Sequence, residues 1–158
     1  MENLQNNSYE KILDYAFKLL GQRRYTEYKL TQKLKTRFKN NCDIPKVISR
    51  LNDLKYLDDF DYAKAYIRSI LSSKPCGKYL LAQKLKTQGL KSHIVQKAIE
   101  ESQINEQDLA EEALNKKLSS LAKLPQEKRV QKALYFLKSR GFKSGTIYKT
   151  IEQIPKNC

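Results

Sequence analysis

The sequence predicts an all-α fold of three tandem three-helix repeats, nine helices in all, in an elongated and curved array. Apolar residues recur three and four positions apart along nearly the whole chain, which is the spacing of one helix face. Only 5 glycines and 4 prolines occur among the 158 residues, which leaves few sites for hairpin turns. The chain also repeats itself, which indicates stacked units that bury their apolar faces against one another.

The repeat is clearest in the pentapeptide QKLKT, which occupies residues 32–36 and recurs at residues 83–87, an offset of 51. A weaker copy, LKSRG at residues 137–141, aligns with LKTQG at residues 85–89 at an offset of 52. Apolar positions further along keep these offsets: Ile44, Val95 and Ile147. We therefore expect three repeats, at residues 8–57, 58–104 and 105–154.

In the first repeat, three helices are expected at about residues 8–20, 26–38 and 43–54. Asn7 is placed to begin a capping box for the first of them, and Gly21 is placed to end it in a left-handed turn. Thr26 is the predicted N-cap of the second helix. Asp43 is the predicted N-cap of the third, which has a proline in its first turn.

In the second repeat, the first helix opens on three acidic residues within residues 58–61. Residues 74–77 break the chain, Gly89 closes the second helix, and Ser92 is the predicted cap of the third.

In the third repeat, Asn105 is the predicted cap of the first helix, and Pro125 begins the second. Gly141 ends that helix, and Ser144 is the predicted cap of the last one. No apolar alternation of period two is long enough to predict a strand.

The chain is strongly basic, with 31 lysines and arginines against 17 aspartates and glutamates and a net charge of +14. The excess is spread over the predicted repeats, at +6 for residues 1–57, +3 for residues 58–104 and +5 for residues 105–158. Such a charge attracts nucleic acid, an anionic membrane surface or an acidic protein groove, and charge alone does not choose among them. A lysine-rich composition also favours solubility.

Several classes of site find no support. Three scattered cysteines, Cys42, Cys76 and Cys158, and one histidine give no zinc-binding pattern, and they fit free thiols in a reducing compartment. No stretch approaches 18 apolar residues and the first residues are polar, so we expect a cytoplasmic protein with no membrane association.

Catalysis finds little support either. No phosphate-binding or dinucleotide-binding glycine motif occurs, and His93 fits a solvated position better than a site. The acidic residues Asp58, Asp59 and Asp61 have the composition of a metal or acid–base site, but in the first turn of a helix they fit dipole partners and caps better. We expect no enzyme, no cofactor and no metal.

Basic residues of the second helices are the better functional candidates. Lys33 and Lys84 occupy equivalent positions, as do Lys35, Lys86 and Lys138. Stacked repeats would align them into a stripe suited to a phosphate backbone or an acidic groove, although any one lysine here also fits a solvated helix face. The candidate contact residues are Arg24, Lys29, Lys33, Lys35, Arg37, Lys78, Lys84, Lys86, Lys132, Lys138 and Arg140.

Tyrosines near these helices, namely Tyr25, Tyr28 and Tyr79, could stack on bases or anchor a protein interface. Packing at the edge of the core is the commoner role for such residues.

The ordered motifs resemble those of the RecX family of regulatory proteins. The segment YLDDFDYA at residues 56–63 resembles the L-D-D-x-x-[FY]-A opening of that family's central repeat and is the most specific match. The segment RYTEYKL at residues 24–30 resembles the family's entry into its second helix, with Lys29 where a glutamate is usual. Residues 77–89 and LKSRGF at residues 137–142 resemble two later family motifs, with Pro75-Cys76 departing from the usual lysine before the glycine.

That resemblance, which spans residues 8–154, implies a monomeric, non-catalytic modulator of RecA in homologous recombination, DNA repair and the SOS response. It implies binding along the groove of the RecA–single-stranded-DNA filament and suppression of ATPase, strand-exchange and coprotease activity. Two alternatives stay open. One is a general basic helical module that binds single- or double-stranded DNA without RecA, and the other is a metal-dependent enzyme acting through Asp58, Asp59 and Asp61.

Overall fold

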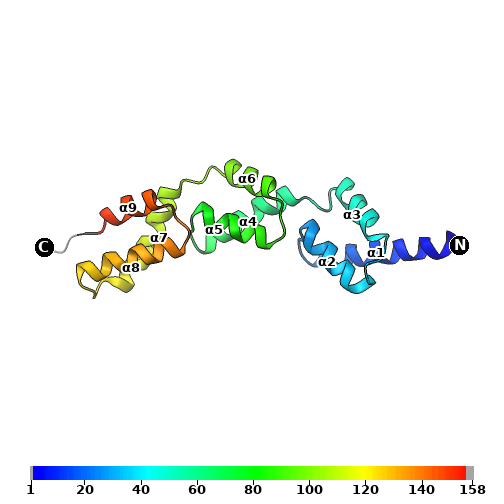
Figure 1. Ribbon diagram of the computed structural model, residues 1–158, viewed down its shortest axis with the longest axis horizontal. Helices are drawn as coiled ribbons and strands as arrows, with labels where there is room; N and C mark the ends of the chain where they lie inside the picture. The colour runs from blue at the N-terminus through cyan, green and yellow to red at the C-terminus, as the bar shows by residue number, and fades with distance from the viewer. Residues whose placement is uncertain (1, 156–158) are drawn as a thin grey trace. The chain divides into compact units, whose positions relative to one another are not determined.

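The computed structural model describes residues 2–155, with the side chains of residues 8–155. Over the described backbone there are nine α-helices and no strand (Figure 1). The helices are α1 (Glu2–Gln22), α2 (Glu27–Phe38), α3 (Ile44–Asp53), α4 (Asp59–Ser73), α5 (Lys78–Thr87), α6 (Ser92–Glu101), α7 (Glu106–Leu121), α8 (Gln126–Ser139) and α9 (Ser144–Glu152). The predicted all-α repeat fold is therefore confirmed.

The chain forms two compact units. The first contains residues 1–63 and 85–95, and the second contains residues 64–84 and 96–158. The division passes within α4, α5 and α6, so each of these helices contributes residues to both units.

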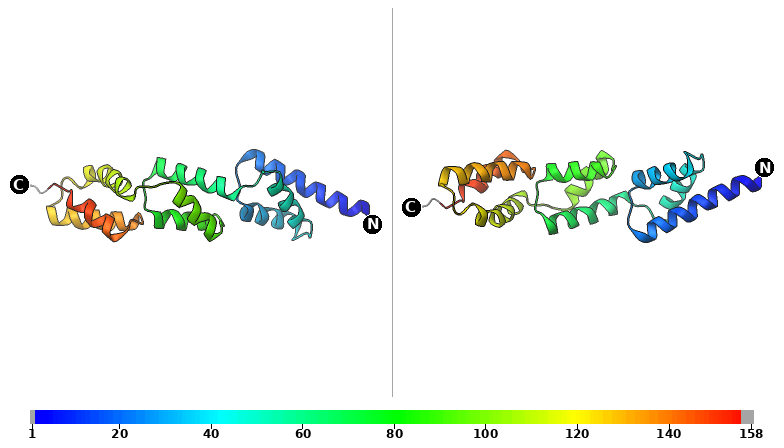
Figure 2. Two further views of the ribbon diagram at one scale, coloured as in Figure 1. Left: turned by 90° about the horizontal axis from the view of Figure 1, so that it is seen from above. Right: turned by 90° about the horizontal axis from the view of Figure 1, so that it is seen from below.

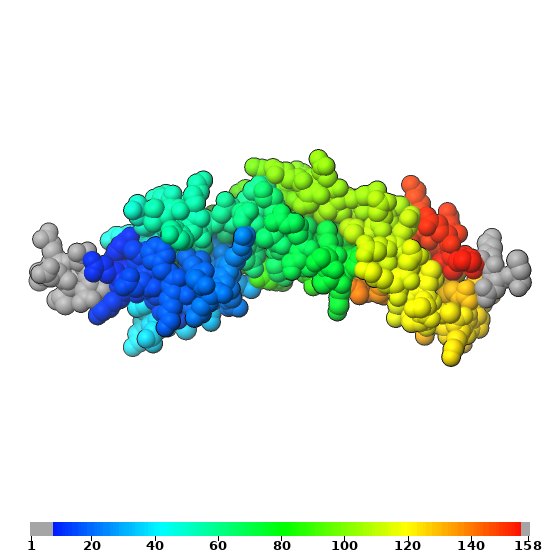
Figure 3. All heavy atoms as spheres, turned by 180° about the vertical axis from the view of Figure 1, so that it is seen from behind, coloured from blue at the N-terminus to red at the C-terminus, as the bar shows by residue number. Residues whose placement is uncertain are grey.

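In the first unit, α1, α2 and α3 pack against one another in pairs (Figure 2). Their facing sides carry apolar residues that water does not reach: Ile12, Ala16, Leu30, Leu34, Val47 and Leu51. Figure 3 shows α1 at the surface of this bundle, beside α3. The three-to-four-residue apolar spacing predicted these core positions, because it places them on one face of each helix.

Helix ends in the first unit follow the sequence in part. Thr26 is the N-cap of α2, and its side chain accepts the Lys29 amide as predicted. The prediction for Asn7 is wrong, because α1 already begins at Glu2; the Asn7 side chain lies outside the described residues. Gly21 does not end α1 either, since it lies inside the helix without a positive φ.

Asp43 precedes α3, as predicted, but its side chain makes no capping hydrogen bond. Its backbone is helical (φ −81°, ψ −13°) rather than extended, so the carboxylate does not reach back to the first turn. It instead pairs with Lys46 at 3.1 Å, which raises the pKa of the Lys46 ammonium.

In the second unit, α7, α8 and α9 form a bundle around buried Ala110, Leu114, Ala133, Leu137 and Ile151. Asn105 caps α7 by accepting the amides of Gln107 and Asp108, as predicted. Pro125, which was predicted to begin α8, is the residue just before its first helical residue, Gln126. Ser92 and Ser144, the predicted caps, are instead the first helical residues of α6 and α9. The cap positions lie one residue earlier, at Lys91 and Lys143, whose carbonyls accept the first helical bonds.

A first set of contacts, here called the first junction, joins the α1–α2 turn to the start of α4 and the α5–α6 turn. The Thr26 hydroxyl donates to the Gln88 carbonyl at 2.7 Å. The Glu27 amide, the first of α2, donates to the carboxylate of Asp59, the first residue of α4, at 2.8 Å. Gly89 has a φ of +83°, and a Cβ placed there would clash with the Tyr28 side chain.

A second junction lies wholly within the second unit. The Gly77 amide donates to the Arg140 carbonyl at 2.9 Å. The amide of Lys78, the first residue of α5, donates to the carboxylate of Glu106, the first residue of α7, at 2.8 Å. A Cβ added at Gly141, whose φ is +74°, would lie 2.6 Å from the Cβ of Leu80.

The two junctions are equivalent in sequence. Gly77 lies 51 residues after Thr26, and Arg140 lies 52 residues after Gln88, which are the offsets of the sequence repeat. In each junction, a carboxylate from the first residue of one helix caps the first amide of another, where the helix dipole favours a negative charge. The sequence repeat is therefore also a repeat of contacts.

Candidate partner-binding surface

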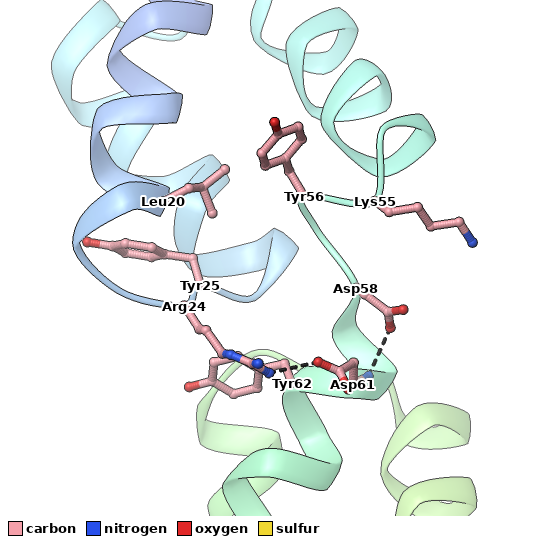
Figure 4. Close-up of a pocket in the computed structure, with 8 residues that line it drawn as sticks. All are labelled: Leu20, Arg24, Tyr25, Lys55, Tyr56, Asp58, Asp61 and Tyr62. Carbon is pink, nitrogen blue, oxygen red and sulfur yellow. Dashed lines mark hydrogen bonds and ion pairs between the residues drawn. The ribbon is translucent and has the colours of Figure 1, made fainter.

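The acidic residues at the start of α4 are all engaged. Asp58 accepts the Asp61 amide at 2.9 Å, and Asp61 pairs with the Arg24 guanidinium at 2.7 Å (Figure 4). The predicted capping role is confirmed for Asp58, whereas Asp59 caps α2 through Glu27. Burial raises the pKa of the Asp59 carboxyl, and the hydrogen bond from the Glu27 amide opposes that rise.

These carboxylates do not form a metal site. Among the described residues, no group of three or more His, Cys, Asp or Glu side chains is placed to hold a metal ion. A cavity of about 260 Å³ beside the Arg24–Asp61 pair (Figure 4) is also lined by Lys55 and Asp58, so charges of both signs face it. Because charges of both signs line this cavity, it favours neither an anionic nor a cationic partner.

On α2, Lys29, Lys33 and Arg37 line one groove, as their one-turn spacing predicts. Lys29 is half-buried, and its ammonium donates to the Gln88 side-chain oxygen at 2.5 Å, so it supports the first junction. Lys33 and Arg37 are exposed, and so is Lys35, which does not line that groove.

This groove, which we call the tyrosine–arginine groove, has a volume of about 610 Å³. It is lined by Tyr15, Arg23, Tyr25, Tyr28, Lys29, Gln32, Lys33, Thr36 and Arg37. The Arg23 guanidinium lies 4.7 Å from the ring centroid of Tyr25, and the Arg37 guanidinium lies 5.9 Å from that of Tyr15. Aromatic rings and cations thus face the same space, and no carboxylate lines it.

Among the α5 candidates, Lys84 and Lys86 are exposed and Lys78 is half-buried. Lys86 belongs to the first unit, and Lys78 and Lys84 belong to the second. The backbone amide of Lys78 is part of the second junction, so this residue has a structural role whatever its side chain binds.

Among the α8 candidates, Lys132 and Lys138 are exposed. Arg140, just after α8, is half-buried; its guanidinium lies 5.2 Å from the ring centroid of Phe136, and its carbonyl accepts the Gly77 amide. Lys132 and Lys138 are therefore better placed than Arg140 to meet a partner.

A second groove, which we call the C-terminal groove, has a volume of about 600 Å³. Its apolar lining comes from Leu134, Phe142 and Ile147. The tyrosines and lysines that line it are Tyr79, Tyr148, Lys138 and Lys143. Of these four residues, only Tyr79 and Lys138 were predicted from the sequence as candidate contacts.

The exposure of one missed residue, Tyr148, could have been predicted from the sequence. Tyr148 falls outside the apolar stripe of Ile147, Ile151 and Ile154 on α9, and a large ring outside the buried stripe of a helix is expected at the surface. Its exposed fraction is 60%. Arg23 and Tyr15 in the other groove gave no comparable signal, because the path of the α1–α2 turn places them there.

His93 and the two described cysteines belong to no metal-binding cluster among the described residues. His93 is exposed at the start of α6. Cys42 is exposed and Cys76 is buried, and burial raises the pKa of the Cys76 thiol. Of the helices in the described part of the chain, none is long and apolar enough to cross a membrane.

Fold and surface together define the class as an all-helical repeat protein with exposed cations and open grooves. Models of the second and third three-helix domains of RecX match residues 58–99 and 105–151. Regulatory protein RecX of Prosthecochloris aestuarii is 33% identical over 159 residues, covering 98% of this chain and 100% of its own. Its Chlorobaculum tepidum counterpart is 32% identical over 142 residues, covering 90% and 87% of the two chains. The chain belongs to the RecX family.

A solved structure carries the same fold. The crystal structure of RecX from Lactobacillus salivarius superimposes with a TM-score of 0.84 over 94% of this chain and 97% of that one, at 18% sequence identity. The helical arrangement is therefore kept although most side chains differ.

Proposed function

We propose that this protein is a negative regulator of the RecA recombinase that binds the RecA–single-stranded-DNA filament and inhibits its ATPase, strand-exchange and coprotease activities. The observation that carries the proposal is the exposure of lysines at equivalent positions of the second helices: Lys35 on α2, Lys86 on α5 and Lys138 on α8. Membership of a family of regulatory proteins supports it.

The proposed mechanism is multivalent binding without catalysis. Each exposed cation on a helix surface contributes little, about 0.2–1 kcal/mol per ion pair. Equivalent cations on three linked helices add a local-concentration effect, because one bound segment holds the next near its own contact. A regulator of this kind acts in the cytoplasm, in recombination, DNA repair and the SOS response, and needs no cofactor. We further propose that the protein works as a monomer and that its repeats span residues 8–57, 58–104 and 105–154.

The test is RecA-driven ATP hydrolysis on single-stranded DNA with rising amounts of the purified protein. We expect hydrolysis to fall as the protein is added, and strand exchange to fall in parallel. Unchanged hydrolysis at a several-fold excess of protein over RecA would exclude filament regulation. An inhibitory effect that disappears when excess naked DNA is present would instead indicate competition for DNA.

The tyrosine–arginine groove favours a second candidate, a module that binds single-stranded nucleic acid directly. Bases stack on aromatic rings and phosphates pair with cations, and Tyr28 and Lys33 offer both within one groove. Tyr28 is 53% exposed, so its ring is accessible.

This candidate is tested by the fluorescence anisotropy of a labelled oligothymidine with the full-length protein. If the protein binds the oligothymidine directly, its affinity should fall steeply as the salt concentration rises. Lys33→Glu should weaken that binding more than Lys18→Glu on α1, the control that makes the same charge change. RecA inhibition by a protein that binds the oligothymidine only weakly would favour the first candidate.

A further inference from the structure

The C-terminal groove has an apolar floor. Leu134 of α8, Phe142 of the α8–α9 turn and Ile147 of α9 line it, with Phe142 and Ile147 largely buried and Leu134 half-buried. Above this floor stand two exposed rings, Tyr79 at 66% exposure and Tyr148 at 60%. Its volume of about 600 Å³ falls within the range of about 300–1,000 Å³ typical of ligand-binding clefts.

The charge along the groove has one sign. Lys138 and Lys143 line it, both are exposed, and neither makes an ion pair with any described residue. No aspartate or glutamate lines it, and the first turn of α9 holds no acidic residue. The local potential is therefore positive over an apolar surface, and an anionic partner with apolar groups complements both.

Nucleic acid and an acidic protein segment are both anionic, and the residues that line the groove favour the protein segment. Nucleic acid presents planar bases and favours aromatic faces with guanidinium groups, as in the tyrosine–arginine groove. The C-terminal groove instead has no guanidinium group in its lining, and its floor combines the aliphatic Leu134 and Ile147 with the largely buried Phe142. Branched aliphatic side chains provide a pocket for apolar side chains of a peptide, in the manner of an interface anchor.

From these observations we propose that the C-terminal groove binds an acidic protein segment, whose one or two apolar side chains occupy the floor while its carboxylates meet Lys138 and Lys143. Tyr79 and Tyr148 flank the bound segment, and they suit that position because a tyrosine ring adds contact area at small cost in conformational entropy.

The second junction holds the groove in shape. The Gly77–Arg140 hydrogen bond of 2.9 Å and the close approach of Gly141 to Leu80 fix the start of α5 against the α8–α9 turn. Tyr79 follows the first of these contacts by two residues, and Phe142 and Lys143 follow Gly141 directly. A groove held by backbone contacts is preformed, which lowers the entropic cost of binding.

The inference goes beyond the regulation of RecA and does not depend on it, because the partner is defined by its chemistry alone. The probe is a library of random twelve-residue peptides displayed on phage and selected on the full-length protein. We expect enrichment of peptides that combine several acidic residues with Leu, Ile or Phe. Enrichment of peptides without that combination would overturn the proposal.

The selected peptide, labelled with fluorescein, is then measured by anisotropy against variants. Tyr148→Ala combined with Lys143→Glu is expected to weaken binding by about thirtyfold or more, the size of effect seen when an interface anchor is lost. Tyr148→Phe, which keeps the ring, is expected to bind within about threefold of the original protein. The matched control is Tyr135→Ala combined with Lys128→Glu, since Tyr135 is 61% exposed, Lys128 is an exposed lysine of the same helix, and neither lines the groove.

Circular dichroism of each variant checks that the fold is kept, which the exposure of Tyr148 and Lys143 leads us to expect. Equal peptide binding by the double variant and by the original protein would exclude the groove as the binding site. An oligothymidine that binds in the groove, shown by loss of its affinity in the groove double variant but not in the control with Tyr135→Ala and Lys128→Glu, would assign the groove to nucleic acid and overturn the proposal.

Discussion

At the scale of single residues, the lack of a Cβ at a glycine allows two turns between helices to pack in close contact. Gly89 adopts a φ that side chains rarely allow, and it approaches the Tyr28 ring too closely for a Cβ. Gly145, in the first turn of α9, meets nothing within 4 Å. The two glycines therefore have opposite roles, one required by the junction and the other dispensable.

The first prediction compares these glycines. Gly89→Ala should lower the free energy of unfolding by about 1–3 kcal/mol, because the new Cβ both strains the backbone and displaces the Tyr28 ring. Gly145→Ala should leave it unchanged or raise it by about 0.5–1 kcal/mol, since alanine is the better helix former. Chemical denaturation measures both. Equal effects of the two substitutions would show that the contact between Gly89 and Tyr28 is not close in solution.

A second prediction concerns the Asp59 carboxyl. Burial raises its pKa, so the folded state holds this proton more tightly than the unfolded state does. The stabilisation that results is complete below the ordinary aspartate pKa of about 3.9, and it is lost as the pH rises through the raised pKa. The difference in unfolding free energy between the original protein and Asp59→Asn should therefore change as the pH rises from about 3.9 through the raised pKa of Asp59.

Denaturation curves at several pH values, recorded for both proteins, give this difference. Asn keeps an oxygen that can accept the Glu27 amide, so Asp59→Ala is the variant that removes the cap, at a cost of about 0.5–2 kcal/mol. A difference between Asp59→Asn and the original protein that is constant with pH would contradict the raised pKa.

At the scale of helices, the sequence predicted the buried faces well because apolar spacing is a local property. Leu30, Leu34, Leu85 and Leu137 all lie on predicted stripes and are fully buried. Caps that depend on one turn of chain, such as Thr26 and Asn105, were also predicted. The prediction failed at Asn7 and Gly21, since residues with weak helix preference do not end a helix when nothing else competes for their backbone.

Contacts between distant helices could not be predicted from spacing alone. The Asp59 carboxylate was assigned to its own helix, and it caps α2 instead. Lys29 was assigned to a partner, and its ammonium binds Gln88. Both residues lie on the helices that the sequence predicted for them. The neighbour that each side chain contacts depends on how the turns between helices pack against one another.

The third prediction belongs to α5. Leu85→Ala should destabilise the protein by about 2–5 kcal/mol, because the leucine is fully buried and its removal leaves a cavity. Thermal or chemical unfolding measures the effect. Gln83→Ala, an exposed position on the same helix, is the control and should change stability by less than about 0.5 kcal/mol. A near-neutral Leu85→Ala would mean that this face of α5 does not lie in a core.

At the scale of the whole molecule, the sequence repeat has a structural meaning. Each junction is made from an equivalent pair of turns and an equivalent carboxylate cap, so the chain uses one contact scheme twice. The second helices of the three repeats are α2, α5 and α8. The candidate lysines at equivalent positions on these helices are exposed, and their role in binding stays a prediction.

We propose that these equivalent lysines bind the RecA filament, and the affinity of charge-reversed variants for the filament tests this proposal. The variant carries Lys35→Glu, Lys86→Glu and Lys138→Glu. Its control carries Lys11→Glu, Lys18→Glu and Lys149→Glu, which make the same charge change at exposed positions of α1 and α9.

Co-sedimentation with RecA filaments assembled on single-stranded DNA gives the affinity of each protein. We expect the first variant to lose at least about tenfold in affinity and the control much less, although both keep the helical circular dichroism of the original protein. Equal affinities of the two variants would contradict the claim, because binding would then depend on net charge and not on the repeated positions of the second helices.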